Sequence, residues 1–265
     1  MSERPLPTPP AGYVSLDEGR MRAMGLAALA APLREALRAG GLYAYAAAHP
    51  AARAFAGRGI AYAVPLPGDA ARVVVRHSRH GGFFAALTGD RFLGATRAPR
   101  ELATALRLAR AGVPTPEIVA YATYPARGVG RRADVVSREV PDSADLAATL
   151  VPDAPEASRR SVLDAIVRLL AALTLAGARH PDLNVKNILV QRAGGAPPLA
   201  LVLDVDRVWF DRPGDQHVTE RNVARLARSA RRWRERGQRI ALADTDLGWI
   251  AAAAHAAARV APAAG

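Results

Sequence analysis

One short segment beyond the middle of the chain, His-Pro-Asp-Leu-Asn-Val-Lys-Asn, constrains the fold of this 265-residue sequence more than any other feature. It runs from His180 to Asn187 and places Asp182 and Asn187 five residues apart. A later apolar stretch ends in a second carboxylate, Asp204. Together these side chains supply a proton acceptor and oxygen ligands for a hard metal ion. A fold that uses them must bring the segment and the end of the apolar stretch together.

The order of these residues fits the kinase catalytic-loop pattern H-x-D-L-x-x-x-N without a gap. In such loops the aspartate accepts the proton of the attacking hydroxyl, while the asparagine and a later aspartate hold the metal ions that bridge the nucleotide phosphates. We therefore predict Asp182 as the catalytic base and Asn187 and Asp204 as Mg²⁺ ligands. A helix cap or turn is the alternative for any one of them alone, but three at these spacings favour phosphoryl transfer.

Composition limits the class of protein. The length is sufficient for one large or two small lobes, and the absence of cysteine excludes disulfides and thiolate metal sites. The formal net charge of +12 is carried almost entirely by arginine, because Lys186 is the only lysine. With abundant alanine, glycine and proline, this bias indicates a GC-rich genome. The alternative is an anionic partner, either a phosphorylated substrate or a membrane surface.

The sequence has no run approaching the roughly 18 apolar residues that cross a bilayer. Its proline-rich start, Met1–Pro10, lacks the apolar core of a secretory signal. We therefore expect a protein that is soluble, or peripheral on a membrane at most.

Periodicity and turn signals predict a series of helices and strands. We predict helices at residues 20–39, 100–111, 157–177, 218–236 and 247–260. We predict strands at residues 60–65, 72–77, 118–124 and 133–137, with short apolar segments at 188–190 and 199–203. Strands followed by helices indicate an α+β protein with two unequal lobes.

The arrangement of these segments resembles the lipopolysaccharide kinase family, specifically its 3-deoxy-D-manno-octulosonic acid (Kdo) kinase branch. The similarity extends over residues 55–235, and its segments are Gly57–Tyr62, Val75–His77, Arg79–Gly82, Gly89–Leu93, Glu101, Gly112–Pro116, Ser137–Ser143, the catalytic loop and Asn222–Trp233. It implies a bilobal protein-kinase-like fold, with a small antiparallel sheet and one main helix in the N-lobe and a larger, mostly helical C-lobe. We expect an N-terminal extension with a helix over residues 1–55, a nucleotide-binding lobe over 56–140 and a catalytic lobe over 141–265.

The resemblance also implies an activity. Family members of this branch use ATP and Mg²⁺ to phosphorylate the 4-hydroxyl of a Kdo residue on a lipid A precursor, at the cytoplasmic face of the inner membrane. We therefore expect a Kdo–lipid A precursor, or a related acidic sugar, as the acceptor.

Roles for residues ahead of the catalytic loop follow from the same resemblance. Gly57 and Gly59 would let backbone amides approach the nucleotide phosphates, although Tyr62 stands where a kinase loop has its third glycine and a plain hairpin is the alternative. Arg76 takes the place of the phosphate-pairing lysine, with Glu101 as its partner, because arginine can bridge phosphate and carboxylate. A surface arginine and a first-turn helix glutamate are the alternative for this pair.

Three further residues lie in the catalytic loop or after Asp204. We predict that Lys186 neutralises charge on the transferred phosphoryl group, with a solvated lysine as the alternative. Asp206 would assist the metal or pair with Arg207. His180 is expected to brace the loop through hydrogen bonds.

Two basic stretches would suit an anionic partner, and solvated faces are the alternative for both. One, next to the expected phosphate site, comprises Arg79, His80, Arg91, Arg97 and Arg100. The other, on the helix predicted at 218–236, comprises Arg221, Arg225, Arg228, Arg231, Arg232, Arg234 and Arg236 with Trp233, while Val223, Leu226 and Ala230 would pack inward.

Two other functions stay open from the sequence. A soluble small-molecule phosphotransferase of the aminoglycoside or choline kinase type has a similar core, but it usually carries histidine where Asn184 stands and lacks the Arg79–Gly82 segment. A degenerate kinase fold would act as a basic scaffold or bind nucleic acid. The presence of Asp182, Asn187 and Asp204 argues against this last function, so nucleic acid is not the expected partner.

Overall fold

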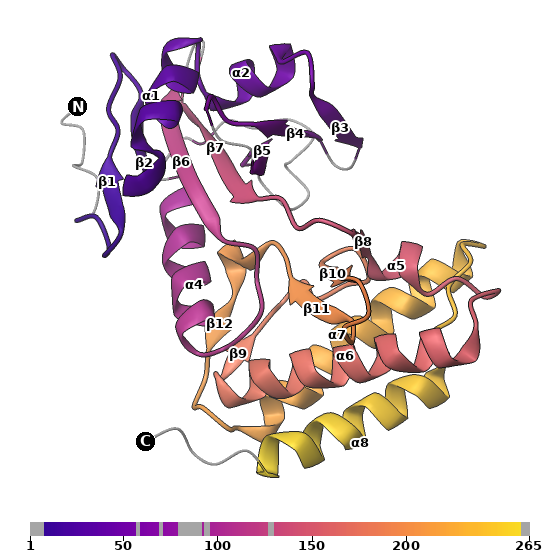
Figure 1. Ribbon diagram of the computed structural model, residues 1–265. Coiled ribbons are helices and arrows are strands. Elements are labelled where there is room, and N and C mark those ends of the chain that lie inside the picture. Colours follow the sequence, from indigo (N-terminus) through magenta and orange to yellow (C-terminus); the bar gives the residue numbers. More distant parts are fainter. Residues whose placement is uncertain are drawn as a thin grey trace. The chain divides into compact units, whose positions relative to one another are not determined.

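A computed structural model gives the structure of the protein and describes residues 8–56, 59–68, 71–78, 92, 96–126 and 130–260. The chain forms two compact units. The first comprises residues 1–103 and 117–139, and the second comprises residues 104–116 and 140–265. Figure 1 labels the elements of both units. Within the described ranges, every helix is too short or too polar to cross a lipid bilayer.

The first unit is built on a seven-stranded antiparallel sheet with the strand order β1-β2-β6-β7-β5-β4-β3. The strands are β1 (Tyr13–Ser15), β2 (Arg22–Leu26), β3 (Arg53–Ala56), β4 (Ile60–Pro65), β5 (Arg72–His77), β6 (Ile118–Pro125) and β7 (Arg131–Arg138). The predicted hairpin of β4 and β5 is confirmed, with Tyr62 opposite Val75. The predicted strands β6 and β7 are also confirmed, and they form the buried centre of the sheet.

Helices pack against this sheet and enclose its core. They are the short 3-10 helix η1 (Ala27–Leu29), α1 (Ala30–Arg38) and α2 (Leu42–Ala48). The core beneath them is made of aliphatic side chains such as Leu33, Leu37, Val64, Val75 and Val119. Helix α4 (Ala98–Arg110), predicted at 100–111, begins in the first unit and continues into the second.

The predicted helix at residues 20–39 is wrong in its first part, because residues 22–26 form β2 and α1 begins only at Ala30. Strand β2 pairs with β6 over residues 22–25, and these long-range hydrogen bonds override the local helical spacing. Gly25 makes the close packing possible, since a Cβ atom there would lie 2.6 Å from Leu33 Cδ1 and 3.2 Å from the Cβ of Ala120.

The second unit combines two small sheets with three long helices. One sheet has the order β11-β10-β8 and the other pairs β12 with β9. The strands are β8 (Ser143–Asp145), β9 (Ala178–Arg179), β10 (Ile188–Gln191), β11 (Leu199–Val202) and β12 (Trp209–Phe210). The helices are α5 (Leu146–Thr149), α6 (Glu156–Leu175), the 3-10 helix η2 (Val205–Arg207), α7 (Gln216–Glu235) and α8 (Asp244–Val260). The helices predicted at 157–177, 218–236 and 247–260 are therefore confirmed. The two short apolar segments form β10 and β11, which pair with each other.

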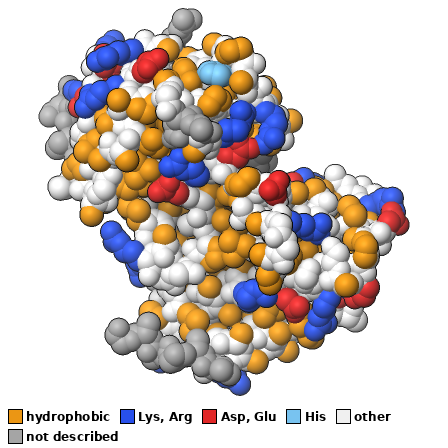
Figure 2. All heavy atoms as spheres, viewed as in Figure 1, with side chains coloured by type: hydrophobic (Ala, Val, Ile, Leu, Met, Phe, Trp, Pro, Cys, Tyr) orange, Lys and Arg blue, Asp and Glu red, His pale blue; other side chains and the backbone are white. Residues whose placement is uncertain are grey.

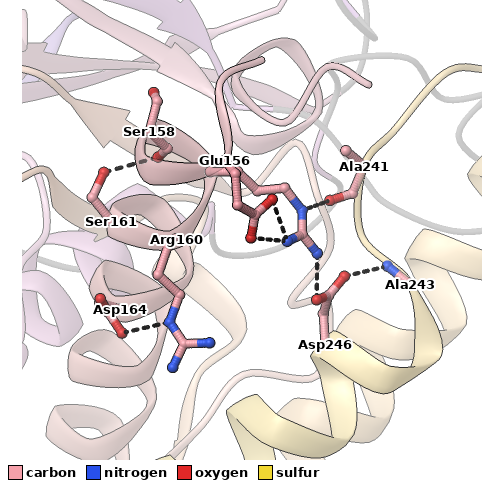
Figure 3. A network of polar contacts seen from close by, with 9 residues as sticks. Glu156, Ser158, Arg160, Ser161, Asp164, Ala241, Ala243 and Asp246 are labelled. Atoms are coloured by element: carbon pink, nitrogen blue, oxygen red, sulfur yellow. Dashed lines mark hydrogen bonds and ion pairs between the residues drawn. The ribbon is translucent and has the colours of Figure 1, made fainter. Parts of the chain in front are cut away.

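Helix α6 is the central element of the second unit, with α8 alongside it (Figure 1). A polar network joins the starts of these two helices (Figure 3). The Arg159 guanidinium donates a hydrogen bond to the Asp246 carboxylate and two to the carboxylate oxygens of Glu156, at 3.0 and 3.2 Å. It also donates to the carbonyl oxygen of Ala241 at 3.4 Å. Asp246 in turn accepts from the backbone of Ala243 at 2.7 Å, which caps α8. Arg159 thus links α6 to the chain that leads into α8.

We expect Arg159→Ala to lower the free energy of unfolding by about 2–3 kcal/mol, because it leaves the mostly buried Asp246 carboxylate without its cation. Denaturant unfolding measures this change. Glu156→Ala is the matched control: the Glu156 side chain is 75% exposed, compared with 13% for Asp246, so its loss is expected to cost less than about 1 kcal/mol. Equal losses in the two variants would contradict this assignment.

Candidate active site

The two predicted metal ligands lie at neighbouring ends of a pair of strands. Strands β10 and β11 are antiparallel, with Ile188 opposite Val202. The pairing continues one step further, since the amide of Leu203 donates to the carbonyl oxygen of Asn187 at 2.9 Å. Asp204 follows directly. The fold therefore brings the end of the catalytic loop and the end of the apolar stretch together, as the sequence predicts.

Hydrogen bonds within the loop give it a defined shape. Asn184 Oδ1 accepts from the backbone amides of Lys186 at 2.9 Å and Asn187 at 3.1 Å. The side-chain nitrogens of Asn184 and Asn187 both donate to the carbonyl oxygen of Asp182, at 3.1 and 2.9 Å. Because the Asn187 nitrogen is engaged, its Oδ1 is the atom suited to hold a cation. Asn184 is thus a structural residue of the loop, a role that its sequence position alone did not indicate.

His180 braces the loop as predicted. It is 1% exposed; its Nε2 lies 2.9 Å from the carbonyl of Leu203, and its Nδ1 accepts from the amide of Asp182 at 3.2 Å. These partners require a neutral ring that carries its proton on Nε2. Burial lowers the pKa of His180, against the opposing effects of the Leu203 carbonyl and nearby carboxylates. One imidazole therefore connects the predicted base to the strand end that precedes Asp204.

The neutral state of His180 makes stability depend on pH. Folding lowers the pKa of His180. The neutral His180 side chain therefore stabilises the fold fully above the usual histidine pKa of about 6.5. This stabilisation is lost as the pH falls through the lowered pKa of the folded protein. We expect thermal unfolding temperatures to drop as pH falls below about 6.5, and His180→Gln to reduce that drop.

His217 is the matched control for this pH effect. It is exposed, and its pKa is raised by the hydrogen bond to Glu220. Its contribution therefore has the opposite sign, present at low pH and lost as pH rises. An unchanged pH dependence in His180→Gln would contradict the proposed neutral brace.

Asp204 has an unusual backbone conformation. Its φ of 55° and ψ of 49° are left-handed, and among the described non-glycine residues only Asp142 shares a positive φ. The strand before it is held firmly: Val202 donates to the carbonyl of Pro114 at 2.9 Å, and its own carbonyl accepts from Thr115 Oγ1 at 2.9 Å. Strained residues that a firm framework maintains are concentrated at functional sites, which supports a role for Asp204.

The donor set fits a magnesium ion that arrives with a nucleotide. Asn187 offers an amide oxygen and Asp204 a carboxylate, and Mg²⁺ typically takes one or two such protein ligands together with phosphates and water. The described residues contain no cluster of three or more histidine, aspartate or glutamate side chains able to hold a metal ion.

One face of α7 carries residues whose contacts with the catalytic loop the sequence analysis did not predict. Four side chains, spaced by three or four residues, contact the loop: Asn222, Arg225, Ser229 and Trp233. Asn222 is fully buried and binds the backbone of His180 at 2.9 Å and of Ala178 at 3.0 Å. Arg225 Nη2 donates to Asp182 Oδ1 at 2.8 Å. Ser229 Oγ accepts from the amide of Val185 at 3.2 Å. Their helical spacing was the available signal.

Three of the arginines that we considered for an anionic surface instead form ion pairs with aspartates of the same unit. Arg225 pairs with Asp182, while Arg231 and Arg234 pair with Asp244. Leu226 and Ala230 are buried, as predicted. The remaining arginines of this stretch, Arg221, Arg228 and Arg232 on α7 and Arg236 just after it, are exposed. A contact with anionic headgroups stays a prediction for these four residues.

Lys186 has partners of its own. Its ammonium group lies 2.9 Å from Asp145 Oδ2 and 5.1 Å from the centre of the Trp233 ring. Asp145 also caps α5 by accepting from Ala148 at 3.0 Å. The lysine is half exposed. Its action on a phosphoryl group stays a prediction.

The predicted contact between Arg76 and Glu101 is present in the first unit. The Arg76 guanidinium, at the end of β5, donates to the Glu101 carboxylate in the first turn of α4, and Glu101 is only 3% exposed. Gly59 directly precedes β4. Gly57 lies outside the described residues, as do Arg79, His80 and Arg91 of the first basic stretch. Their role in nucleotide binding stays a prediction.

Residues 56–250 match the model of the lipopolysaccharide kinase (Kdo/WaaP) family. The chain belongs to this family. A 3-deoxy-D-manno-octulosonic acid kinase from Vibrio parahaemolyticus is 31% identical over 199 residues, which cover 68% of this chain and 76% of the relative. A protein of the same name from Xanthomonas oryzae is 33% identical over 177 residues, which cover 65% of this chain and 66% of the relative.

The structural comparison gives the fold. A solved structure of WaaP in complex with acyl carrier protein is similar with a TM-score of 0.51 and 18% identity, over 77% of each chain. The chain therefore has the α+β protein-kinase-like fold that the sequence predicts. Members of this kinase family transfer a phosphoryl group to a hydroxyl, which assigns the chain to the phosphotransferases, and the family implies the use of ATP.

Proposed function

We propose that the protein uses ATP and Mg²⁺ to phosphorylate the 4-hydroxyl of a Kdo residue on a lipid A precursor, in the biosynthesis of lipopolysaccharide. The observation that carries this proposal is the position of Asp182, Asn187 and Asp204 on one loop and one adjoining strand end, in a chain of the Kdo/WaaP family. The Vibrio and Xanthomonas relatives, which are named as Kdo kinases, support the choice of acceptor.

In this proposal each predicted site residue of the second unit has its own part in the reaction. Asp182 accepts the proton of the attacking hydroxyl. Asn187 and Asp204 hold Mg²⁺, which neutralises charge on the phosphates when it is bound. Lys186 adds positive charge near the transferred group and would have to exchange its contact with Asp145 for the phosphoryl oxygens. The protein thereby contributes mainly positioning and electrostatic stabilisation.

The first unit supplies nucleotide binding in this proposal. Arg76 holds the phosphates, and Glu101 fixes its guanidinium in place. Gly57 and Gly59 allow backbone amides to approach the same phosphates. Residues 56–140 serve as the nucleotide-binding lobe and residues 141–265 as the catalytic lobe. Residues 1–55 serve as an N-terminal extension whose strands β1 and β2 complete the sheet of the first unit.

The site of action that we propose is the cytoplasmic face of the inner membrane, where the protein is peripheral. The exposed arginines of α7 provide a basic surface for anionic headgroups. On the face drawn in Figure 2, lysine and arginine side chains are scattered among acidic and apolar ones. The coloured atoms of this face form no continuous basic stripe of the kind that nucleic acids bind.

Mass spectrometry of a reaction that contains purified protein, ATP, Mg²⁺ and a Kdo–lipid A precursor tests this function. We expect the acceptor to gain one phosphoryl group, with fragmentation placing it on the 4-oxygen of Kdo. Soluble amino sugars and choline serve as competing acceptors. ADP formation with those compounds, and none with the Kdo lipid, would replace this proposal by a small-molecule phosphotransferase. Salt-sensitive DNA binding without turnover would favour a scaffold.

A further inference from the structure

Arg225 is the cation that touches the predicted base. It lies on α7, and its Nη2 atom donates to Asp182 Oδ1 at 2.8 Å. The two side chains are 32% and 31% exposed, so the pair is accessible from solvent. A reacting hydroxyl must come within hydrogen-bond reach of Asp182 to lose its proton. Any acceptor that reacts therefore also comes close to the Arg225 guanidinium.

Arg225 has unused hydrogen-bonding capacity. A guanidinium group carries five N–H donors. Within the described part of the chain, the bond to Asp182 is the only one that its side chain makes, and its buried Nε has no partner. A buried donor without a partner is unfavourable, so the position is not explained by stability alone. A planar group with spare paired donors is suited to a carboxylate, which it can bind through two parallel hydrogen bonds.

Lys186, which lies on the loop itself, is less suited to this task. Its ammonium group pairs with Asp145 at 2.9 Å and lies above the Trp233 ring. It is also a point charge, which binds a carboxylate with less directional preference than an arginine does. Arg225 differs in that it contacts the base itself.

We propose that Arg225 binds the carboxylate of an acidic acceptor sugar and thereby selects such sugars over neutral ones. This inference rests on the proposed function, because a Kdo acceptor is a sugar acid. Its carboxylate is attached to the ring carbon two positions from the carbon that bears the reacting hydroxyl. A hydroxyl held at Asp182 thus places the carboxylate within a few bond lengths of the guanidinium. On binding, Arg225 exchanges its hydrogen bond to Asp182 for bonds to the acceptor carboxylate and leaves the base open to the hydroxyl proton.

The test compares two acceptors, a Kdo–lipid A precursor and its carboxyl methyl ester, with the full chain, ATP and Mg²⁺. We expect wild-type protein to prefer the acid. In Arg225→Met, kcat/KM for the acid is expected to fall roughly 10- to 100-fold, mainly through KM, while kcat/KM for the ester changes little. Arg225→Lys, which keeps the charge but not the paired donors, is expected to recover part of the preference.

Arg179→Met is the matched control. Arg179 is 33% exposed and pairs with an aspartate of the same unit, Asp211, at 3.5 Å. It is expected to keep the acid-to-ester ratio of the wild type. Thermal unfolding verifies that each variant is folded, and Arg225→Gln replaces Arg225→Met if the latter does not fold.

Three outcomes are decisive. Loss of the acid preference in the Arg225 variants alone supports the inference. An unchanged acid-to-ester ratio, or equal loss for both acceptors, overturns it and leaves Arg225 as a residue that only positions Asp182. A wild-type protein that phosphorylates neither acceptor overturns the proposed function, and the inference falls with it.

Discussion

Asp182→Asn is expected to lower the rate of phosphoryl transfer roughly 10²- to 10⁴-fold while the protein stays folded. The substitution keeps the size of the side chain but removes the carboxylate that would accept the hydroxyl proton. Arg225 binds the carboxylate, but the residues of the loop itself bind the backbone at this position. Asn184 and Asn187 donate to its carbonyl oxygen, and His180 accepts from its amide. The loop is therefore expected to keep its conformation without the charge.

Initial rates with labelled ATP and a Kdo–lipid acceptor measure this effect, and circular dichroism with thermal unfolding verifies the fold. Asp211→Asn is the control, because Asp211 also pairs with an arginine and is 40% exposed, compared with 31% for Asp182. We expect that variant to retain wild-type turnover. Undiminished turnover in Asp182→Asn would show that another group accepts the proton.

Elements stabilised by nearby residues were predictable from the sequence. Helix α6 was expected at 157–177 and occupies Glu156–Leu175, since its apolar positions recur at helical spacing along one continuous segment. Strands β10 and β11 coincide with the two short apolar segments that the sequence shows on either side of a glycine–proline turn at 194–198. In both cases the signal and the structure that it predicts lie within about twenty residues of each other.

Strand β2 shows where such patterns fail. Its residues have helical spacing, but Met24 lies opposite Tyr121 in the sheet, and the pairing joins segments that are far apart in the chain. No local pattern reports a partner at that distance. Gly25, which permits the close contact with α1, was equally uninformative in isolation.

The candidate site divides in the same way. Asp182, Asn187 and Asp204 could be predicted because the chemistry of phosphoryl transfer demands these residue types at a short spacing. Arg225 could not, because its contact with Asp182 spans 43 residues and depends on which face of α7 packs on the loop. The arginine-rich composition of α7 indicated a surface role for all of its arginines, and this prediction is wrong for Arg225.

Asp204→Gly is expected to reduce turnover by roughly 10²- to 10³-fold, the loss that several kcal/mol of metal-ion stabilisation represents. Glycine is the informative substitution at this position because Asp204 has a φ of 55°. Glycine adopts a left-handed conformation without the strain that other residues incur. The variant therefore removes the predicted metal ligand and keeps the backbone that carries it, so we expect it to remain folded.

Asp142→Gly separates the loss of a ligand from the change in backbone. Asp142 is exposed and has a φ of 50°, so the same substitution changes the same kind of residue in the same conformation. We expect Asp142→Gly to keep wild-type turnover. Initial rates measured over a range of Mg²⁺ concentrations distinguish the two, because loss of a ligand raises the Mg²⁺ concentration needed for activity as well as lowering the maximal rate. Equal losses in the two variants would assign the effect to the backbone and would remove Asp204 from the metal site.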